Sequence, residues 1–364
     1  MRQFVFLTFM FLIPFSWAQP VITADDLFAA DDTARVSETM DPNIDISITG
    51  PNAVWDFSHL IANSQRLEEA FPIADGGFIL NLQFGPTAPP PYVSDYFRPF
   101  DGIPFEDFGS FLPVNIENVN RIVRKEDDSL FYTGLSITAD GQQFGFRSDT
   151  IETGYHFPLE YGDSYTSRGY TYADFDPLFT GTFIQYRQRY TSVDGHGTLV
   201  TPYGNFTALR AHHRIEEQDS LYVEIQGFGN WIPIERTTHE YEWWVNDEKR
   251  PVCKIETEEV NGSENITAIT YRDEYLGLDA SLASNKLVES SLYPNPARES
   301  FTVRSNSTIE SIRIFGLEGR QHKQINFTSS ATKQTLNTAA LPAGMYKVQL
   351  KTSKGATFLK LLIK

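Results

Sequence analysis

The chain of 364 residues contains a single cysteine, Cys253. One thiol cannot form an internal disulfide, so the fold has to be stable without cross-links. Zinc sites built from two or four cysteines are excluded for the same reason. Apolar residues alternate with polar ones around Cys253, which predicts a buried position in a strand.

Common catalytic motifs are also missing. The sequence has no His-Glu-x-x-His, no Gly-x-Ser-x-Gly, no Gly-rich phosphate loop and no Gly-x-Gly-x-x-Gly. Zincin, α/β-hydrolase, P-loop and Rossmann functions therefore lose their usual support. His212 and His213 are adjacent in a predicted strand and point to opposite faces, so they cannot bind one metal ion together. We expect no catalytic motif, no metal site and no cofactor.

Long apolar runs are absent after the first eighteen residues. Residues 1–18 combine a positive Arg2, an apolar run from Phe4 to Phe15 and a small-residue end at Ala18, which predicts a secretory signal peptide. That run is too short to span a bilayer. No later segment reaches eighteen apolar residues, so we expect a soluble mature protein without a transmembrane segment, exported through the periplasm.

Positive charge is scarce in most of the chain. Residues 19–275 hold 17 basic and 42 acidic side chains, whereas residues 276–364 hold 12 basic and 5 acidic ones. This asymmetry predicts a domain boundary near residue 276. An acidic body repels phosphate backbones, so nucleic acid is not an expected partner.

The residues that are abundant indicate an all-β fold. Aromatic side chains make up 14% of the chain, with 24 Gly and 20 Pro to punctuate turns. Ten or more short strands follow one another from residue 120 to residue 275, with Asp140-Gly141 as the clearest hairpin turn. Ile44, Ile46 and Ile48 alternate with polar residues and predict a further strand that ends at Gly50. We expect an antiparallel meander forming a curved sheet, a half-barrel or a sandwich.

Two groups of aromatic residues are candidates for lining a ligand site. Residues 84–111 carry eight aromatics interleaved with six prolines, a composition that favours an irregular flap. The flap could cover one face of the sheet, which we favour, or close over a cavity. A second group near the end of the body could stack on a sugar ring or form core. The candidate ligand-lining residues are Tyr92, Tyr96, Phe97, Trp231, Trp243 and Trp244.

Carboxylates are so numerous in the body that a glycosidase-like pair occurs easily by chance. Asp174 and Asp176, or Glu216 and Glu217, could form such a pair. Spacing alone does not distinguish either pair from a solvated surface.

The last 75 residues carry four motifs in order. They are Tyr293-Pro294-Asn295-Pro296, the stretch from Ile312 to Arg320 with Gly319, the stretch from Leu341 to Tyr346 with Gly344, and a final strand with Lys360 and Lys364. About seven short strands in this space predict a small Ig-like β-sandwich.

These motifs resemble the type A C-terminal sorting domain of the type IX secretion system, the Por secretion tail, at about residues 290–364. Gly316 departs from the polar residue that is commoner there. The Asn-x-x-Trp-Asp-Phe-Ser stretch at residues 52–58 resembles the opening of many secreted proteins of unknown function that carry the same tail. The resemblance implies contact with the type IX machinery, removal of the tail by its sorting protease, and release or attachment to surface polysaccharide outside a Gram-negative cell.

The sequence therefore predicts four regions: a signal peptide at 1–18, an acidic β-rich body at 19–275, a linker at 276–290 and the sorting domain at 291–364. The favoured hypothesis for the body is a non-enzymatic module that binds a surface component, an apolar ligand or a glycan. A carbohydrate-active hydrolase with paired carboxylates and a structural surface component without a pocket remain alternatives.

Overall fold

The computed structural model describes residues 19–41, 43–100, 114, 116–139, 141–176, 178–225, 228–276, 290–316, 321–327, 331–339, 341–352 and 355–364. The predicted signal peptide lies outside these residues, as do Gly319, most of the linker and residues 101–111 of the flap.

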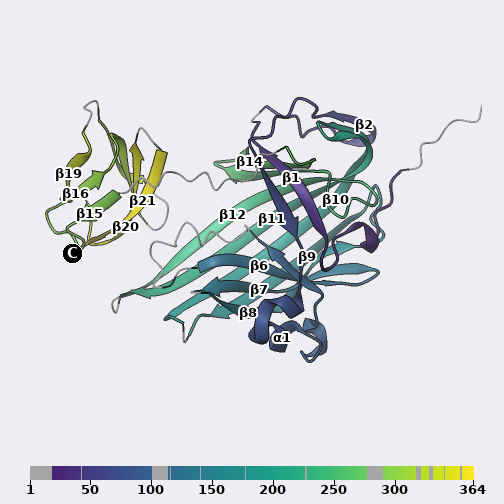
Figure 1. Ribbon diagram of the computed structural model, residues 1–364, viewed down its shortest axis with the longest axis horizontal. Helices are drawn as coiled ribbons and strands as arrows, with labels where there is room; N and C mark the ends of the chain where they lie inside the picture. Colours follow the sequence, from purple (N-terminus) through teal and green to yellow (C-terminus); the bar gives the residue numbers. More distant parts are fainter. Residues whose placement is uncertain are drawn as a thin grey trace, which may run out of the picture.

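The body is built almost entirely from strands (Figure 1). Its strands are β1 (Thr33–Thr39), β2 (Gly50–Asp56), β3 (Ser64–Glu69), β4 (Phe71–Pro72), β5 (Tyr96–Pro99), β6 (Ile116–Lys125), β7 (Ser129–Ala139), β8 (Gln142–His156), β9 (Ser164–Asp174), β10 (Gly181–Thr201), β11 (Gly204–Ile225), β12 (Phe228–Trp244), β13 (Cys253–Val260) and β14 (Ser263–Arg272). One α-helix, α1 (Gly77–Phe84), and three 3₁₀ turns, η1 (Ala24–Asp26), η2 (Ile73–Gly76) and η3 (Pro90–Tyr92), complete the described part of the body.

These fourteen strands form one strongly curved sheet. Its order is β3-β1-β14-β13-β12-β11-β10-β9-β8-β7-β6-β5-β4, with β2 added beside β10. The pairing from β4 through β14 is antiparallel between successive long strands, as consecutive hairpins predict. The sheet curls until β3, at one end of the order, comes close to β5 near the other end, so the sheet is nearly closed (Figure 1). This confirms the predicted all-β meander.

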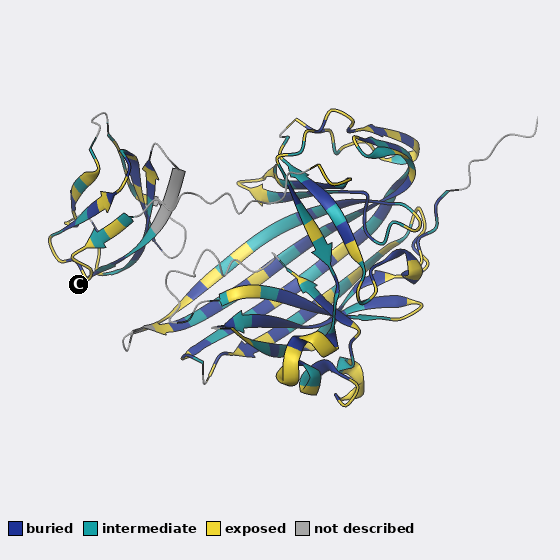
Figure 2. Ribbon diagram, viewed as in Figure 1, coloured by how far each residue is buried: buried dark blue, intermediate teal, exposed yellow. Residues whose placement is uncertain are grey.

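Side chains alternate between the inside and the outside of the curled sheet. On β10 the odd-numbered residues from 181 to 193 are buried, while the even-numbered ones are half-buried or exposed. The same alternation produces the dark and light bands across β10, β11 and β12 in Figure 2. Because side chains of a strand change face at every residue, each long strand sends one set of residues to the interior.

The interior is apolar at both ends and polar between them. At one end Phe175, Phe183 and Leu221 belong to one hydrophobic cluster. At the other end Phe157 and Trp244 belong to a second cluster. Along β10 the interior positions change from apolar to charged and back to apolar.

A third cluster lies on the outer face and holds β2 against the sheet. Trp55 and Phe57 pack edge-on against Trp243, with ring centroids 5.9 and 5.1 Å apart. The Asp56 carboxylate accepts hydrogen bonds from the backbone and hydroxyl of Ser58. Trp55 and Phe57 are therefore packing residues, and Asp56 closes a turn. The predicted buried strand position of Cys253 is confirmed.

The predicted strand from Ile44 to Ile48 is wrong. Those residues lie outside the sheet, and the strand begins at Gly50, where a turn was expected. The Asp45 carboxylate accepts hydrogen bonds from the backbone N–H and hydroxyl of Ser47, at 2.9 and 2.6 Å. Such a local turn competes with the ladder of a sheet, which explains why the alternating pattern does not become a strand.

The described part of the predicted flap is more regular than expected. Residue 84 ends α1, and Tyr96–Pro99 forms β5, which pairs with both β4 and β6. β5 tolerates a proline because Pro99 is its last residue. At the end of a strand, the missing backbone N–H of proline disturbs the hydrogen-bond ladder least.

The C-terminal tail is a small β-sandwich with its own core. Its strands are β15 (Ser290–Tyr293), β16 (Ser300–Ser305), β17 (Ile309–Gly316), β18 (Gln321–Asn326), β19 (Lys333–Asn337), β20 (Gly344–Thr352) and β21 (Gly355–Ile363). A three-stranded sheet, β15-β16-β19, and a four-stranded sheet, β18-β17-β20-β21, share one apolar cluster that includes Phe301, Ile312 and Val348. Among the residues described above, no helix has the length and apolarity required to cross a membrane.

Candidate functional site

The interior of the body contains a cavity of about 430 Å³. It lies between the two apolar ends of the curled sheet and is lined by residues from strands on opposite walls, among them Tyr132 on β7, Arg187 on β10 and Glu240 on β12. The wall is unusual because so many of its side chains are ionisable. Eight basic and seven acidic residues line it.

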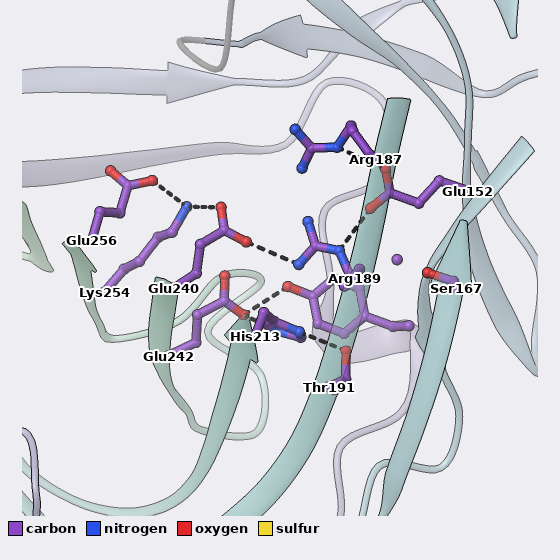
Figure 3. Close-up of polar contacts among 12 residues, drawn as sticks. Glu152, Ser167, Arg187, Arg189, Thr191, His213, Glu240, Glu242, Lys254 and Glu256 are labelled. Atoms are coloured by element: carbon purple, nitrogen blue, oxygen red, sulfur yellow. Dashed lines mark hydrogen bonds and ion pairs between the residues drawn. The ribbon is translucent and has the colours of Figure 1, made fainter. Parts of the chain in front are cut away.

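Eight charged side chains form a continuous series in which basic and acidic groups alternate, and Figure 3 shows the six from Arg187 to Glu256. The order of this ion-pair chain is Arg236, Glu217, Arg187, Glu152, Arg189, Glu240, Lys254 and Glu256. Arg187 Nε and Arg189 Nε donate to the two oxygens of Glu152 at 2.9 and 2.7 Å. Four positive and four negative charges neutralise one another, as buried ions require.

Strand register brings the ion-pair chain together. Arg187 and Arg189 are separated by one residue on β10 and therefore both point inward. Glu152 on β8 reaches them across β9 because the intervening position is Gly169. A Cβ added there would lie 3.1 Å from the Cβ of Glu152 and 3.2 Å from its Oε2, so a larger residue would displace the carboxylate.

A second polar centre adjoins the ion-pair chain at Glu242. Glu242 Oε2 accepts hydrogen bonds from Tyr155 Oη at 2.6 Å and Trp244 Nε1 at 2.9 Å, and it contacts His213 Nε2 at 3.3 Å. The other ring nitrogen of His213 contacts the hydroxyl of Thr191 at 2.8 Å (Figure 3). The prediction that His212 and His213 face opposite sides is confirmed, with His213 fully buried.

The carboxylates at this site are held in their ionised form. Burial opposes the charge of Glu152, but Arg187 and Arg189 outweigh it and lower its pKa to about 2. Burial also opposes the charge of Glu242, but its interactions with His213 and Lys254 together lower its pKa to about 2. A general acid needs a proton to give, so these groups suit binding and structure better than acid catalysis.

A third group lies where β3 meets the loop before β13. Glu68 forms ion pairs with Arg66 at 3.1 Å and with Arg250 at 3.4 Å. Burial opposes the charge of Glu68, but Arg250 and Arg66, with Arg98 further away, lower its pKa to about 2. Arg66 also pairs with Glu38, so the two arginines and two glutamates of this group balance.

Arg98 on β5 and Arg121 on β6 are the two arginines of the cavity wall without an ion pair among the described residues. They are directly opposite each other in the β5–β6 ladder, and both line the cavity. Neither has an acidic group within ion-pair distance among the residues that the structure describes. Like charges at opposed positions repel each other, so this arrangement is unfavourable by itself.

Two of the six ligand-lining residues predicted from the sequence, Tyr96 and Trp244, line the cavity. The other four lie elsewhere: Phe97 and Trp243 are buried in apolar clusters, Trp231 is 49% exposed on the outer face, and Tyr92 is half-buried on η3 with its hydroxyl bonded to the Ser148 carbonyl.

The carboxylate pairs suggested by the sequence do not meet at the cavity. Glu216 and Glu217 are neighbours on β11 and face opposite sides, Glu216 outward and Glu217 into the ion-pair chain. Asp174 and Asp176 stand at the end of β9, where Asp174 accepts the backbone N–H of Asp176 in a turn. The charged residues of the interior were missed. Their signal in the sequence is the alternation of charge with neutral residues, such as Arg187-Gln188-Arg189.

The carboxyl group of Asp219 differs from the other interior carboxylates because its pKa is raised. Burial, with the nearby charge of Glu217, raises the pKa of Asp219 from 3.8 to about 7. Its Oδ1 has no hydrogen-bond partner within the described structure, and Gln185 Nε2 approaches Oδ2 at 3.4 Å. Ionising this group in the folded state therefore costs free energy.

We expect Asp219→Asn to stabilise the protein in a pH-dependent way. The pKa of Asp219 is higher in the folded state than in the unfolded state. The free-energy cost of ionising Asp219 in the folded state therefore grows between about pH 4 and pH 7 and is complete above pH 7. The variant should match the wild type near pH 4 and exceed its unfolding free energy by up to ~4 kcal/mol at pH 8. Urea unfolding at the two pH values measures this. Equal gains at both would contradict it.

In the tail, the Tyr-Pro-Asn-Pro motif is hydrogen-bonded to the final strand, β21, through Asn295, and we call this contact the clasp. The Asn295 side chain donates to the Lys360 carbonyl at 2.9 Å and accepts the Leu362 N–H at 2.8 Å. The backbone N–H of Ala297 donates to the Leu362 carbonyl, and the Ala297 carbonyl accepts the N–H of Lys364. Residues 291–364, which include this clasp, match the family of secretion system C-terminal sorting domains.

Residues 291–364 are a secretion system C-terminal sorting domain. This domain indicates export to the cell surface or the medium by the type IX secretion system, as in Bacteroidetes, and interaction with that machinery. No curated protein and no solved structure matches the chain. The function of the body has to be inferred from its own residues.

The predicted sorting-signal residues occupy distinct places in the sorting domain. Tyr346 is buried in the core and donates to the Pro342 carbonyl at 2.7 Å, while Gly344 begins β20. Lys360 and Lys364 belong to the C-terminal end, and Tyr293 is 44% exposed. Gly319 is outside the described residues. Pro294 and Pro296 flank Asn295 in the clasp.

Proposed function

We propose that the protein is an exported binding protein whose body holds a small molecule in the interior cavity. Residues 1–18 act as the signal peptide for passage through the periplasm, and residues 276–290 link the body to the sorting domain. The type IX sorting protease removes the sorting domain, and the body is released or attached to surface polysaccharide. The sorting-domain match supports this route.

The cavity is the observation that carries the binding proposal. Its volume of about 430 Å³ lies within the range of small-molecule sites in proteins. Aromatic rings of Tyr96, Tyr132, Tyr155 and Trp244 share the wall with charged groups. Ligand sites typically combine aromatic side chains with polar groups that fix the orientation of the ligand, although here the polar groups are unusually many.

The electrostatics support binding over glycoside hydrolysis. An acid-base pair needs one carboxyl group whose pKa is raised toward the working pH. At the cavity, Glu68 and Glu242 both have a pKa lowered to about 2, and that of Glu240 is also lowered. Asp219, whose pKa is raised, is absent from the cavity wall. A structural component without a pocket is disfavoured by the cavity itself.

Filling the cavity should abolish binding without unfolding the body. Thr238 lines the cavity, and Thr237 faces the outer side of the same strand. Native mass spectrometry of the secreted protein should show a bound small molecule in the wild type and in Thr237→Trp. The Thr238→Trp variant should lack this bound molecule. Its melting temperature should stay close to that of the wild type.

Two results would contradict the proposal. One is a wild-type protein that carries no small molecule and gains no thermal stability from compounds of any charge. The other is a ligand that Thr238→Trp retains in full, because such a ligand would be bound elsewhere.

A further inference from the structure

The wall formed by β5 and β6 holds two arginines, Arg98 and Arg121, that form no ion pair with the residues that the structure describes. Arg121 is only 6% exposed, yet it has no acidic partner in the described residues. The nearest carboxylates are already paired: Glu152 with Arg187 and Arg189, and Glu68 with Arg66 and Arg250. A buried charge without a partner is costly, and proteins keep one where it serves a purpose.

Two aromatic rings contact the Arg121 guanidinium. The Arg121 Cζ lies 3.5 Å from the centroid of Phe100 and 4.2 Å from that of Tyr132. Ring contacts of this kind use the faces of the guanidinium, whereas its five N–H donors lie in the plane. Those donors have no acceptor among the described residues, and the residue lines the cavity.

Arg98 places a second guanidinium at the same wall. It is paired with Arg121 in the backbone ladder and reaches the same cavity. Arg250 on the neighbouring wall is 3% exposed and has an Nη1 without a hydrogen-bond partner in the described structure. Two opposed arginines bind a planar or tetrahedral anion by several charge-assisted hydrogen bonds, and such an anion removes their mutual repulsion.

We propose that the ligand of the cavity is a small organic anion, whose carboxylate, phosphate or sulfate group is bound between Arg98 and Arg121. The remainder of the ligand lies against the aromatic rings of Tyr96, Tyr132 and Tyr155. This inference rests on the proposed function, because it assigns the chemical class of the ligand that the cavity binds. Neutral ligands are disfavoured because they would leave Arg121 buried without an ion-pair partner among the described residues.

Thermal unfolding with simple anions tests this assignment. The probes are inorganic phosphate, inorganic sulfate and benzoate, each added to the purified full chain at constant ionic strength adjusted with sodium chloride. Tryptophan fluorescence follows the body alone, because the sorting domain has no tryptophan. At least one anion should raise the melting temperature saturably, by roughly 5 °C at about 100 times its Kd.

Three variants separate a ligand-binding role from a structural one. Arg121→Met should melt at or above the wild-type temperature without anion, since it removes an uncompensated buried charge, and should lose the anion-induced rise. Arg98→Met should also lose the anion-induced rise, and it replaces Arg121→Met if that variant does not fold. Arg168→Gln, an exposed residue on the outer face, should keep the full rise.

Each other outcome overturns the inference. If Arg121→Met and Arg98→Met keep the anion-induced rise, the anions bind elsewhere. If both variants melt well below the wild type without anion, the arginines are structural. If no anion acts but native mass spectrometry shows a neutral molecule that Thr238→Trp loses, the inference fails while the proposed function stands. If no molecule of any charge binds, both fail.

Discussion

Replacing Glu152 by glutamine is expected to lower the free energy of unfolding of the body by about 3–5 kcal/mol, the range found when one partner of a buried ion pair is removed. Glu152 is 3% exposed and accepts hydrogen bonds from both Arg187 and Arg189. Glutamine has nearly the same shape, so packing is preserved while two buried guanidiniums lose their shared counter-charge.

The loss should depend on pH in a defined direction. The pKa of Glu152 is lowered from 4.5 to about 2 by Arg187 and Arg189, against the effect of burial. The ionised form therefore stabilises the folded state fully above about pH 4.5, and this contribution disappears as the pH falls toward 2. The difference between wild type and Glu152→Gln should shrink over the same interval.

Urea unfolding followed by tryptophan fluorescence measures the effect. The matched control is Glu216→Gln, which removes a partner of Arg214 on the outer face, where both side chains are more than a third exposed. That variant should change the unfolding free energy by less than ~1 kcal/mol. A loss below 1 kcal/mol for Glu152→Gln would show that the ion-pair chain contributes little to stability.

Deleting residues 291–364 is expected to abolish export while leaving the body folded. The sorting domain is the part of the chain that matches the secretion family, so its loss should reduce the protein in the medium or at the surface to background. The apolar core of the sorting domain is formed entirely by its own residues. The truncated chain should therefore keep the tryptophan-detected melting temperature of the full chain.

A point variant tests the clasp within the sorting domain. Asn295→Ala removes the two hydrogen bonds that fasten the Tyr-Pro-Asn-Pro motif to β21. We expect its export to fall between that of the full and truncated chains. Immunoblots of cells and medium from the producing bacterium measure the partition. A truncated chain exported at the wild-type level would mean that the export signal lies in the body.

The all-β fold could be predicted because alternation and turn residues are local signals. The hairpin between β7 and β8 follows the predicted Asp-Gly turn, and Gly141 has a φ of 76° there. The same alternation was misleading from Ile44 to Ile48, where Asp45 forms a side-chain turn instead. The parallel pairing of β2 with β10 joins residues about 145 positions apart, and its close approach depends on Gly197, where a Cβ would clash with Ala53.

The candidate site could not be predicted because its chemistry depends on register. Arg187-Gln188-Arg189 has the pattern of an ordinary solvent-facing strand, and only closure of the sheet turns the two arginines inward. In the same way Glu152, Glu217 and Glu240 belong to three separate strands, and the sequence does not show that they surround the same cations.

The aromatic candidates illustrate the same limit. Adjacent residues of a strand point to opposite faces, and accordingly Trp244 lies at the cavity and Trp243 in the outer cluster. Which face would hold the cavity depended on the direction in which the sheet curls. Trp231 lies on the outer face of the same strand and remains 49% exposed.

A crystal structure of the protein isolated from the medium would show directly whether the cavity holds an anion. We expect density for a small molecule in the cavity, with an acidic group within hydrogen-bond distance of the Arg98 and Arg121 guanidiniums. A cavity filled only by water, with Arg121 paired to a carboxylate of the chain itself, would contradict it.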